Sequence, residues 1–299
     1  MQVQQKVYDL FEEQLTNWEM ARKNFAALDS VLLKTFDFDD FKVCVQFNPG
    51  RMASSGAKVD AKTIAQRKCF LCEENRPEVQ KGVDYGDFVI LINPFPIFKK
   101  HLTIPRREHI DQHIRPYFKD MLSLAKDLPD FVIFYNGPKC GASAPDHMHF
   151  QAGNKDFLPI VNELPRIKAK KGTLISNNNG VEMVRFDNYL RTVYSLESAD
   201  KEALVEAFNA FFDKLQKGKE EEPMMNVLSV FEDEKWKVYI IVRKAFRPWQ
   251  YTAEGDKNLM VSPATVEVGG MFITPVPEHF ERITKADVID IMSQLTMQI

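Results

Sequence analysis

The spacing of apolar residues along the chain predicts both amphipathic helices and strands. Apolar positions recur every three to four residues over 3–25, 116–128 and 200–217, a period that is typical of a helix with one apolar face. Residues 41–47 alternate between apolar and polar side chains, which predicts a strand. Residues 131–135 form an uninterrupted apolar run and predict a strand that leads into a glycine-containing loop.

Further strands are expected in pairs. Residues 88–109 read as an apolar strand, a turn broken by prolines, and a second strand that ends in a charged run. Residues 226–231 and 236–243 read as strands joined by an acidic turn. The stretch 153–197 shows no clear period, apart from a hairpin or loop tip at 177–180.

Composition and charge exclude several classes of protein. The chain has 299 residues, of which 44% are hydrophobic and 27% are charged, as in ordinary globular proteins. The net charge of −3 argues against a nucleic-acid partner, which requires a basic surface. Four cysteines do not form a disulfide scaffold, and no apolar run has the length of a membrane span. The N-terminus lacks the pattern of a secretory signal, so we expect a cytoplasmic protein without a membrane partner.

The strongest chemical signal is the run His147-Met148-His149-Phe150-Gln151. Alternate residues of a strand share a face, so the two histidines and the glutamine are expected in one site and the apolar pair in the core. A neutral imidazole can attack phosphorus, and an amide can hold a phosphoryl oxygen without titrating. The loop before this run, residues 136–145, contains small residues and backbone donors that suit a phosphate.

The surroundings of the motif have a regular spacing. Asn93 lies eight residues before His101, and His109 lies eight residues after it. Asn136 lies eleven residues before His147. A short motif recurs by chance, so a strand with two incidental histidines is the plain alternative when the motif is taken alone.

Together these residues resemble the histidine-triad superfamily, in the transferase branch where glutamine replaces the third histidine. Galactose-1-phosphate uridylyltransferase, diadenosine tetraphosphate phosphorylase and the GDP-hexose phosphorylases belong to this branch. The resemblance covers residues 65–155 clearly, although Met148 stands where the uridylyltransferases have proline. It implies an α+β fold, with a histidine-triad-like antiparallel sheet and packed helices.

The resemblance also implies two halves, as in the duplicated transferases. The run 243–248 echoes 104–107, but no second His-x-His follows it. We therefore expect an N-terminal half, 1–160, that carries the triad, and a degenerate C-terminal half, 161–299, that supports and binds.

The family's site residues transfer to matching positions of this chain. His149 would form a covalent nucleotidyl-histidine, and Gln151 would hold the α-phosphoryl oxygen. His101 would contact the same region or satisfy the turn, and we expect either with equal weight. The residues expected to bind the nucleotide are Asn93, His101, Asn136, Lys139, Gly141 and Ser143.

The glutamine indicates the reaction class. Glutamine cannot donate a proton to a poor leaving group, so the leaving group should be a stable anion such as a phosphate or sugar phosphate. This favours transfer or phosphorolysis of a nucleoside diphosphate-sugar or dinucleoside polyphosphate, with phosphate or a sugar phosphate as the acceptor. A nucleotide hydrolase and a non-enzymatic nucleotide sensor are the alternatives. Related transferases are often dimers, so a homodimer is possible.

A Cys-x-x-Cys pair, Cys69 and Cys72, has a spacing that is standard for zinc. In the zinc-bearing relatives the histidine after the second strand and the first triad histidine complete the site, which implies His109 and His147 here. With four protein ligands the zinc would be structural. A redox dithiol and two unligated cysteines are the rivals of this interpretation.

The run 51–58, after the first expected strand, is small and basic. It is compatible with a loop that faces a phosphate, but we favour a mobile surface loop.

Overall fold

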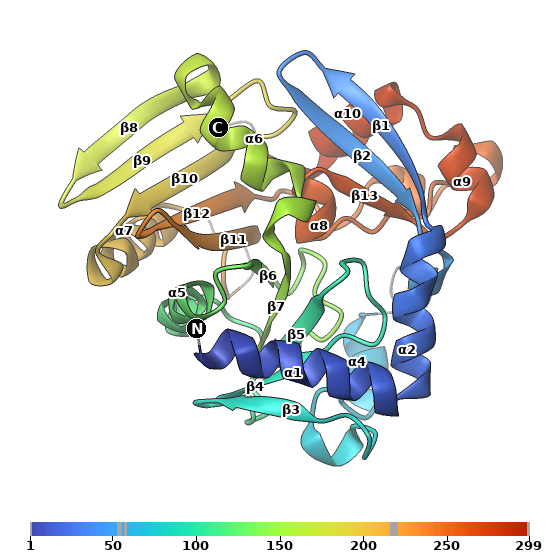
Figure 1. The fold of residues 1–299 in the computed structure, drawn as a ribbon. Helices are drawn as coiled ribbons and strands as arrows, with labels where there is room; N and C mark the ends of the chain where they lie inside the picture. The colour runs from blue at the N-terminus through green and yellow to red at the C-terminus, as the bar shows by residue number, and fades with distance from the viewer. Residues whose placement is uncertain (1, 53–55, 57–58, 216–220, 298–299) are drawn as a thin grey trace.

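The computed structural model describes residues 2–52, 56, 59–215 and 221–297, and its fold is α+β with a large antiparallel sheet, as predicted (Figure 1). The strands are β1 (Leu32–Phe38), β2 (Phe41–Phe47), β3 (Gly82–Tyr85), β4 (Phe88–Ile92), β5 (His101–Pro105), β6 (Phe131–Asn136), β7 (His149–Asn154), β8 (Gly172–Asn178), β9 (Val181–Phe186), β10 (Val193–Ser198), β11 (Met225–Glu232), β12 (Lys235–Val242) and β13 (Met271–Thr274). The helices are α1 (Gln2–Asn17), α2 (Glu19–Ala26), α4 (Ala61–Gln66), α5 (Phe118–Asp127), α6 (Pro159–Lys171), α7 (Lys201–Lys214), α8 (Thr265–Val268), α9 (Pro277–Arg282) and α10 (Lys285–Leu295).

One large sheet runs through the whole molecule. Its ten strands lie in the order β3-β4-β5-β7-β6-β11-β12-β10-β9-β8, and every neighbouring pair is antiparallel. The N-terminal strands meet the C-terminal ones where β6 pairs with β11, with Asn136 opposite Asn226. The motif strand β7 lies between β5 and β6, near the middle of the sheet (Figure 1).

A second, three-stranded sheet joins the two ends of the chain. The hairpin of β1 and β2 is antiparallel, and β13 adds to β2 in parallel, with Met271 opposite Cys44. Both sheets therefore contain strands from residues 1–160 and from residues 161–299. The division of the chain at residue 160 stays a proposal.

The middle of the large sheet is buried on both faces. Phe131, Ile133 and Tyr135 of β6 contribute to one core cluster, whereas Val132 and Phe134 contribute to the other. Helices α1, α5 and α7 supply apolar residues to the first cluster, and α6, α8 and α10 supply them to the second. Burial on both faces explains why β6 is apolar without alternation.

Two segments differ from the pattern-based expectation. The helix expected over 3–25 is divided into α1 and α2, because Trp18 takes an extended conformation (φ −111°, ψ 95°) and its side chain is buried. The stretch 153–197, which showed no clear period, contains α6 and the strands β8 to β10. Pro165 lies inside α6, and most β8 residues are exposed, so neither element has a regular apolar period.

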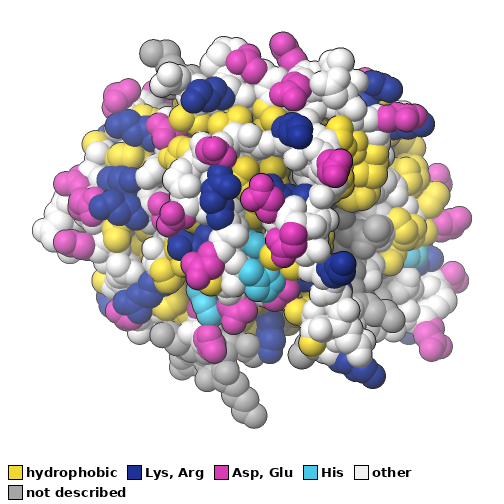
Figure 2. Space-filling view, turned by 90° about the horizontal axis from the view of Figure 1, so that it is seen from below, with side chains coloured by type: hydrophobic (Ala, Val, Ile, Leu, Met, Phe, Trp, Pro, Cys, Tyr) yellow, Lys and Arg dark blue, Asp and Glu magenta, His cyan; other side chains and the backbone are white. Residues whose placement is uncertain are grey.

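The surface carries charges of both signs. On the face seen in Figure 2, basic and acidic side chains are interspersed and form no extended field of one sign, in keeping with the net charge of −3. Among the described residues, no helix combines the length and the hydropathy that a membrane crossing requires.

Candidate functional site

Successive side chains of the motif strand β7 point alternately to a cavity and to the core. His149 and Gln151 line one cavity, whereas Met148 and Phe150 are fully buried in the core. His147 precedes the first residue of β7, and its ring lies beside the two cysteines of the Cys-x-x-Cys pair. The motif therefore serves two neighbouring places rather than one.

His149 presents one ring nitrogen to the cavity. Its Nδ1 donates to the carbonyl oxygen of His147 at 2.8 Å, so the neutral ring carries its lone pair on Nε2. The side chain is 3% exposed, and this burial lowers the pKa of His149 to about 4. The imidazole is therefore neutral and has a fixed tautomer near neutral pH.

Gln151 is oriented by a short relay. The N–H of Ile97 donates to Nδ1 of His101 at 3.1 Å, and the opposite nitrogen, Nε2, donates to Oε1 of Gln151 at 3.0 Å. Burial, together with the charge of Arg51, lowers the pKa of His101 to about 3, so this ring stays neutral. The amide nitrogen of Gln151 is then the group left to donate to a ligand, and His101 satisfies the turn as well.

The cavity in front of His149, which we call the main cavity, has a volume of about 390 Å³. Apolar side chains form most of its wall, and polar groups are placed among them. Its apolar lining includes Trp18, Phe70, Leu71, Leu91, Ile92 and Phe95, and its polar lining includes Arg51, Arg67, Asn75, Gln80, Asn93, Thr103, Ser143, His149 and Gln151.

A smaller cavity of about 60 Å³, the side cavity, adjoins it. Arg51, Ser143 and Gln151 line both cavities, so the two meet beside the motif strand. The C-terminal part of the chain contributes Arg247 and Glu267 to the side cavity. Burial raises the pKa of Glu267 to about 7, against the opposing charges of Arg51 and Arg243.

The loop before the motif fits tightly against α8. Gly141 has φ +98°, and a Cβ placed on it would lie 2.3 Å from the Cβ of Ala264. Asn136 Oδ1 accepts from the backbone N–H of Thr265 at 2.8 Å and from its hydroxyl at 2.6 Å. Asn136, Gly141 and Ser143 all line the side cavity.

The other expected nucleotide-binding residues lie in different places. Asn93 lines the main cavity, where its Nδ2 donates to the hydroxyl of Thr103 at 3.0 Å and its Oδ1 accepts from Phe95 N–H at 2.9 Å. Lys139 is exposed and lines a separate hollow with Glu221. Its part in nucleotide binding stays a prediction that this geometry does not favour.

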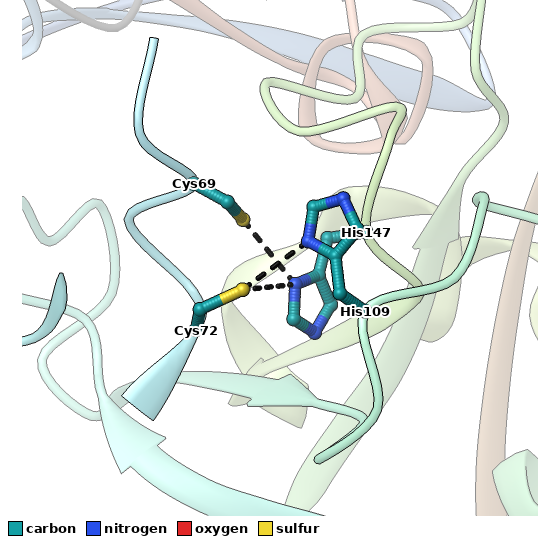
Figure 3. Close-up of side chains that lie close together, drawn as sticks. All are labelled: Cys69, Cys72, His109 and His147. Atoms are coloured by element: carbon teal, nitrogen blue, oxygen red, sulfur yellow. Dashed lines mark hydrogen bonds between the residues drawn. The ribbon is translucent and has the colours of Figure 1, made fainter. Parts of the chain in front are cut away.

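The four expected metal ligands form one cluster (Figure 3). Their donor atoms all lie within 4.8 Å of one another. Nδ1 of His147 lies 3.2 Å from Sγ of Cys69, and Nδ1 of His109 lies 3.2 Å from Sγ of Cys72. Two sulfurs and two imidazole nitrogens in this arrangement are a donor set that zinc accepts as a closed tetrahedral site.

The outer contacts of the cluster also suit a metal. Nε2 of His147 donates to the carbonyl oxygen of Arg106 at 2.7 Å, which leaves Nδ1 unprotonated and directed at the sulfurs. Nε2 of His109 lies 3.8 Å from the Asp146 carboxylate. Between the two cysteines, Phe70 and Leu71 form part of the main cavity wall. The cluster thus connects the cavity wall to the motif.

Some residues of the site were missed by sequence reasoning. Arg51 lies in the run that we expected to be a mobile surface loop, but it lines both cavities and donates to the carbonyl oxygen of Phe95 at 2.6 Å. For Arg51 that expectation was wrong, because the turn after β2 packs against the β4–β5 turn. Residues 53–55 and 57–58 of the same run lie outside the described part of the chain. Glu267, which lines the side cavity, stands in no motif that marks it.

Two family models match the sequence. One is described as a domain of unknown function, DUF4922, and covers residues 10–154. The other is described as "GDPGP1-like, C-terminal domain" and covers residues 165–298. No curated protein matches the sequence.

Among solved structures the chain is similar to yeast Ap4A phosphorylase Apa2. The TM-score is 0.58 at 18% identity, covering 93% of each chain. The AMP complex of that enzyme gives 0.56 at 19% identity, over 93% of this chain and 94% of that one. Its Ap4A complex gives 0.55 at 18% identity, over 91% and 94%. At this identity the likeness establishes a shared fold.

Proposed function

We propose that the chain is an enzyme of the transferase branch of the histidine-triad superfamily, and that it transfers a nucleoside monophosphate group through a covalent bond to His149. The match to the GDPGP1-like C-terminal domain model and the fold shared with yeast Ap4A phosphorylase Apa2 support this proposal. The observation that supports this most directly is the state of that imidazole. Its Nδ1 is tied to a backbone carbonyl, its ring is neutral through burial, and its remaining nitrogen faces the main cavity. These are the properties of a nucleophile that needs no separate base.

The proposed first step exchanges one bond at phosphorus for another. Nε2 of His149 forms a bond to the α-phosphorus, and the bond from that phosphorus to the leaving phosphate oxygen breaks. The electron pair departs with the leaving phosphate as an anion. The amide nitrogen of Gln151 donates to the α-phosphoryl oxygen, and Arg51 and Ser143, which line both cavities, offer charge and a hydroxyl there.

In the second step an acceptor oxygen attacks the same phosphorus, and the bond to Nε2 of His149 breaks. A phosphate or sugar phosphate acceptor would occupy the side cavity, where Arg51 and Arg247 supply positive charge. The apolar main cavity would hold the nucleoside. We propose a nucleoside diphosphate-sugar or a dinucleoside polyphosphate as the donor, in line with the GDPGP1-like domain family and the Ap4A complex of the similar yeast enzyme.

We also propose that Cys69, Cys72, His109 and His147 hold a structural zinc ion. When bound, the ion would cross-link the Cys-x-x-Cys turn to His147, the first residue of the motif, and to His109, which follows β5. All four ligands come from the protein, so these residues act by holding the cavity wall and the carbonyl that orients His149. A cytoplasmic location and a homodimer remain predictions.

The test is the intact mass of the zinc-loaded protein after incubation with ADP-, GDP- and UDP-sugars and dinucleoside polyphosphates. We expect a gain of one nucleoside monophosphate, labile to acid, and no gain in His149→Ala. Products formed with and without orthophosphate then separate a phosphorylase from a hydrolase, because water alone sustains only the hydrolase. A bound nucleotide without adduct or product would contradict the proposal and favour a nucleotide sensor.

A further inference from the structure

The two strands beside the proposed nucleophile separate before they reach it. The paired register of β6 and β7 ends at Phe134 and Gln151. Asn136 and His149, at the facing ends of these strands, are not a ladder pair. On the other side, the β5 residue opposite His149 is Pro105, which has no N–H to donate. His149 is paired with Pro105 on the β5 side, but its backbone N–H and C=O are directed to the β6 side, where the ladder has ended.

The side-chain amide of Gln112 occupies this gap. Its Nε2 donates to the carbonyl oxygens of Asn136 and His149, each at 3.0 Å, and its Oε1 accepts from the N–H of His149 at 2.8 Å. Carbonyl oxygens only accept and an N–H only donates, so these partners fix which end of the amide is nitrogen. One side-chain amide thus supplies the hydrogen bonds that a paired residue of the neighbouring strand would otherwise supply.

Gln112 is itself held in place. Its side chain is fully buried. Its backbone N–H donates to the carbonyl oxygen of Pro145 at 3.1 Å, and the hydroxyl of Tyr135 donates to its carbonyl oxygen at 3.2 Å. Two residues earlier, the carbonyl oxygen of Ile110 accepts from Met148 N–H at 2.7 Å. The amide therefore cannot turn away without breaking several backbone contacts.

We propose that Gln112 is a positioning residue for transfer to His149: its amide holds the backbone of the nucleophile so that Nε2 faces the α-phosphorus. This inference rests on the proposed function of His149. Displacing a reacting atom by about 1 Å costs on the order of 100-fold in rate, so a nucleophile at a strand end that is unpaired on one side needs such a support. Gln112 contacts the backbone of His149 rather than the ring nitrogen that faces the cavity. Its substitution should therefore change the rate constant of transfer more than the affinity for nucleotide.

The test uses the full-length, zinc-loaded protein and two substitutions. In Gln112→Glu an ionised carboxylate would face two carbonyl oxygens, whereas a protonated carboxyl can donate to one of them and still accept from His149 N–H. Burial raises the pKa of the introduced carboxyl, so the neutral form is available at mildly acidic pH. Gln112→Met keeps the volume and has no group to titrate. Gln14→Glu is the matched control, because the buried Gln14 amide also bridges backbone groups, of Val79 and Lys81.

The first readout is the single-turnover rate constant of adduct formation, relative to the wild type at each pH, with the donor that nucleotidylates the wild type. We expect a loss of about 100-fold for both Gln112 variants near pH 8. In Gln112→Glu most of the loss should disappear near about pH 5.5, whereas Gln112→Met should not recover. Binding of nucleoside monophosphate, zinc content and the Gln14→Glu rate should change little. Wild-type rates in both Gln112 variants would overturn the inference.

The second readout is hydrogen exchange of the peptide that contains His149, and it does not depend on activity. We expect faster exchange in Gln112→Glu near pH 8 and in Gln112→Met, but not in Gln14→Glu. If the wild type forms no adduct, the proposed function fails. The exchange still decides whether Gln112 holds this backbone, and unchanged protection would overturn the inference.

Discussion

Glu267 is a buried carboxyl group whose charge state should be visible in stability. Burial raises its pKa to about 7, so between the ordinary value of 4.5 and about 7 the folded protein binds a proton that the unfolded chain releases. Its contribution to stability is thus full below the unfolded pKa and is lost as the pH rises through about 7. Glu267→Gln removes the titration and keeps an oxygen for the N–H of Ala264.

We therefore expect Glu267→Gln to be more stable than the wild type at pH 8 by roughly 3 kcal/mol, and by little at pH 5. Urea unfolding at the two pH values measures this difference. Glu12→Gln, at an exposed position of α1, is the control and should leave the pH dependence unchanged. Equal pH dependence in Glu267→Gln and the wild type would contradict the assigned charge state.

At the residue scale, the sequence was informative where a short spacing carries the chemistry. His149 and Gln151 line one cavity because they are two positions apart on a strand, and the metal cluster combines a local Cys-x-x-Cys turn with two histidines of known spacing. Arg51 and Glu267 reach the site through long-range packing, which local spacing does not reveal. Their roles and those of the motif residues remain proposals.

At the scale of elements, the loop between β6 and β7 depends on its contact with α8. Gly141 and Gly180 both have positive φ, but only Gly141 has a neighbour in the way of a Cβ. We expect Gly141→Ala to be less stable than Gly180→Ala by about 2 kcal/mol, because the second variant meets only backbone strain. Thermal unfolding of the two variants measures this. Equal losses would mean that α8 yields to the added methyl group.

The Cys-x-x-Cys turn is the element that links metal to cavity shape. We expect Cys72→Ser to lose most of the bound zinc and to bind nucleotide more weakly, by about tenfold or more, since Phe70 and Leu71 belong to the cavity wall. Metal analysis and nucleotide titration provide the two measurements. Cys44→Ser lies outside the cluster and should keep both properties. Full nucleotide affinity in the zinc-free variant would contradict this expectation, because it would mean that the metal does not maintain the cavity wall.

At the scale of the whole molecule, the pairing of β6 with β11 and of β2 with β13 makes the two proposed halves interdependent. We expect fragments 1–160 and 161–299 to remain unfolded alone, since each would expose an unpaired strand of the buried sheet. Coexpression should restore a folded pair. Circular dichroism during heating is the measurement, and a cooperative transition in either isolated fragment would contradict the expectation.

The fold class followed from the family motif, but the joining of the chain ends did not. The strand 41–47 was expected from its alternation, whereas its parallel partner β13 has four residues and no distinctive pattern. Pairings between distant segments depend on the completed core, and one sequence alone gives no direct signal for them.

The parallel pairing of β2 with β13 also has a consequence for biosynthesis. Cys44 leaves the ribosome long before its partner Met271 has been made. Until then β2 is paired with β1 alone, and the turn that carries Arg51 follows a strand that lacks its parallel partner. The nascent chain can form the strands around His149 well before the arginine is secured. We therefore expect a growing polypeptide to lack transfer activity until β13 has emerged.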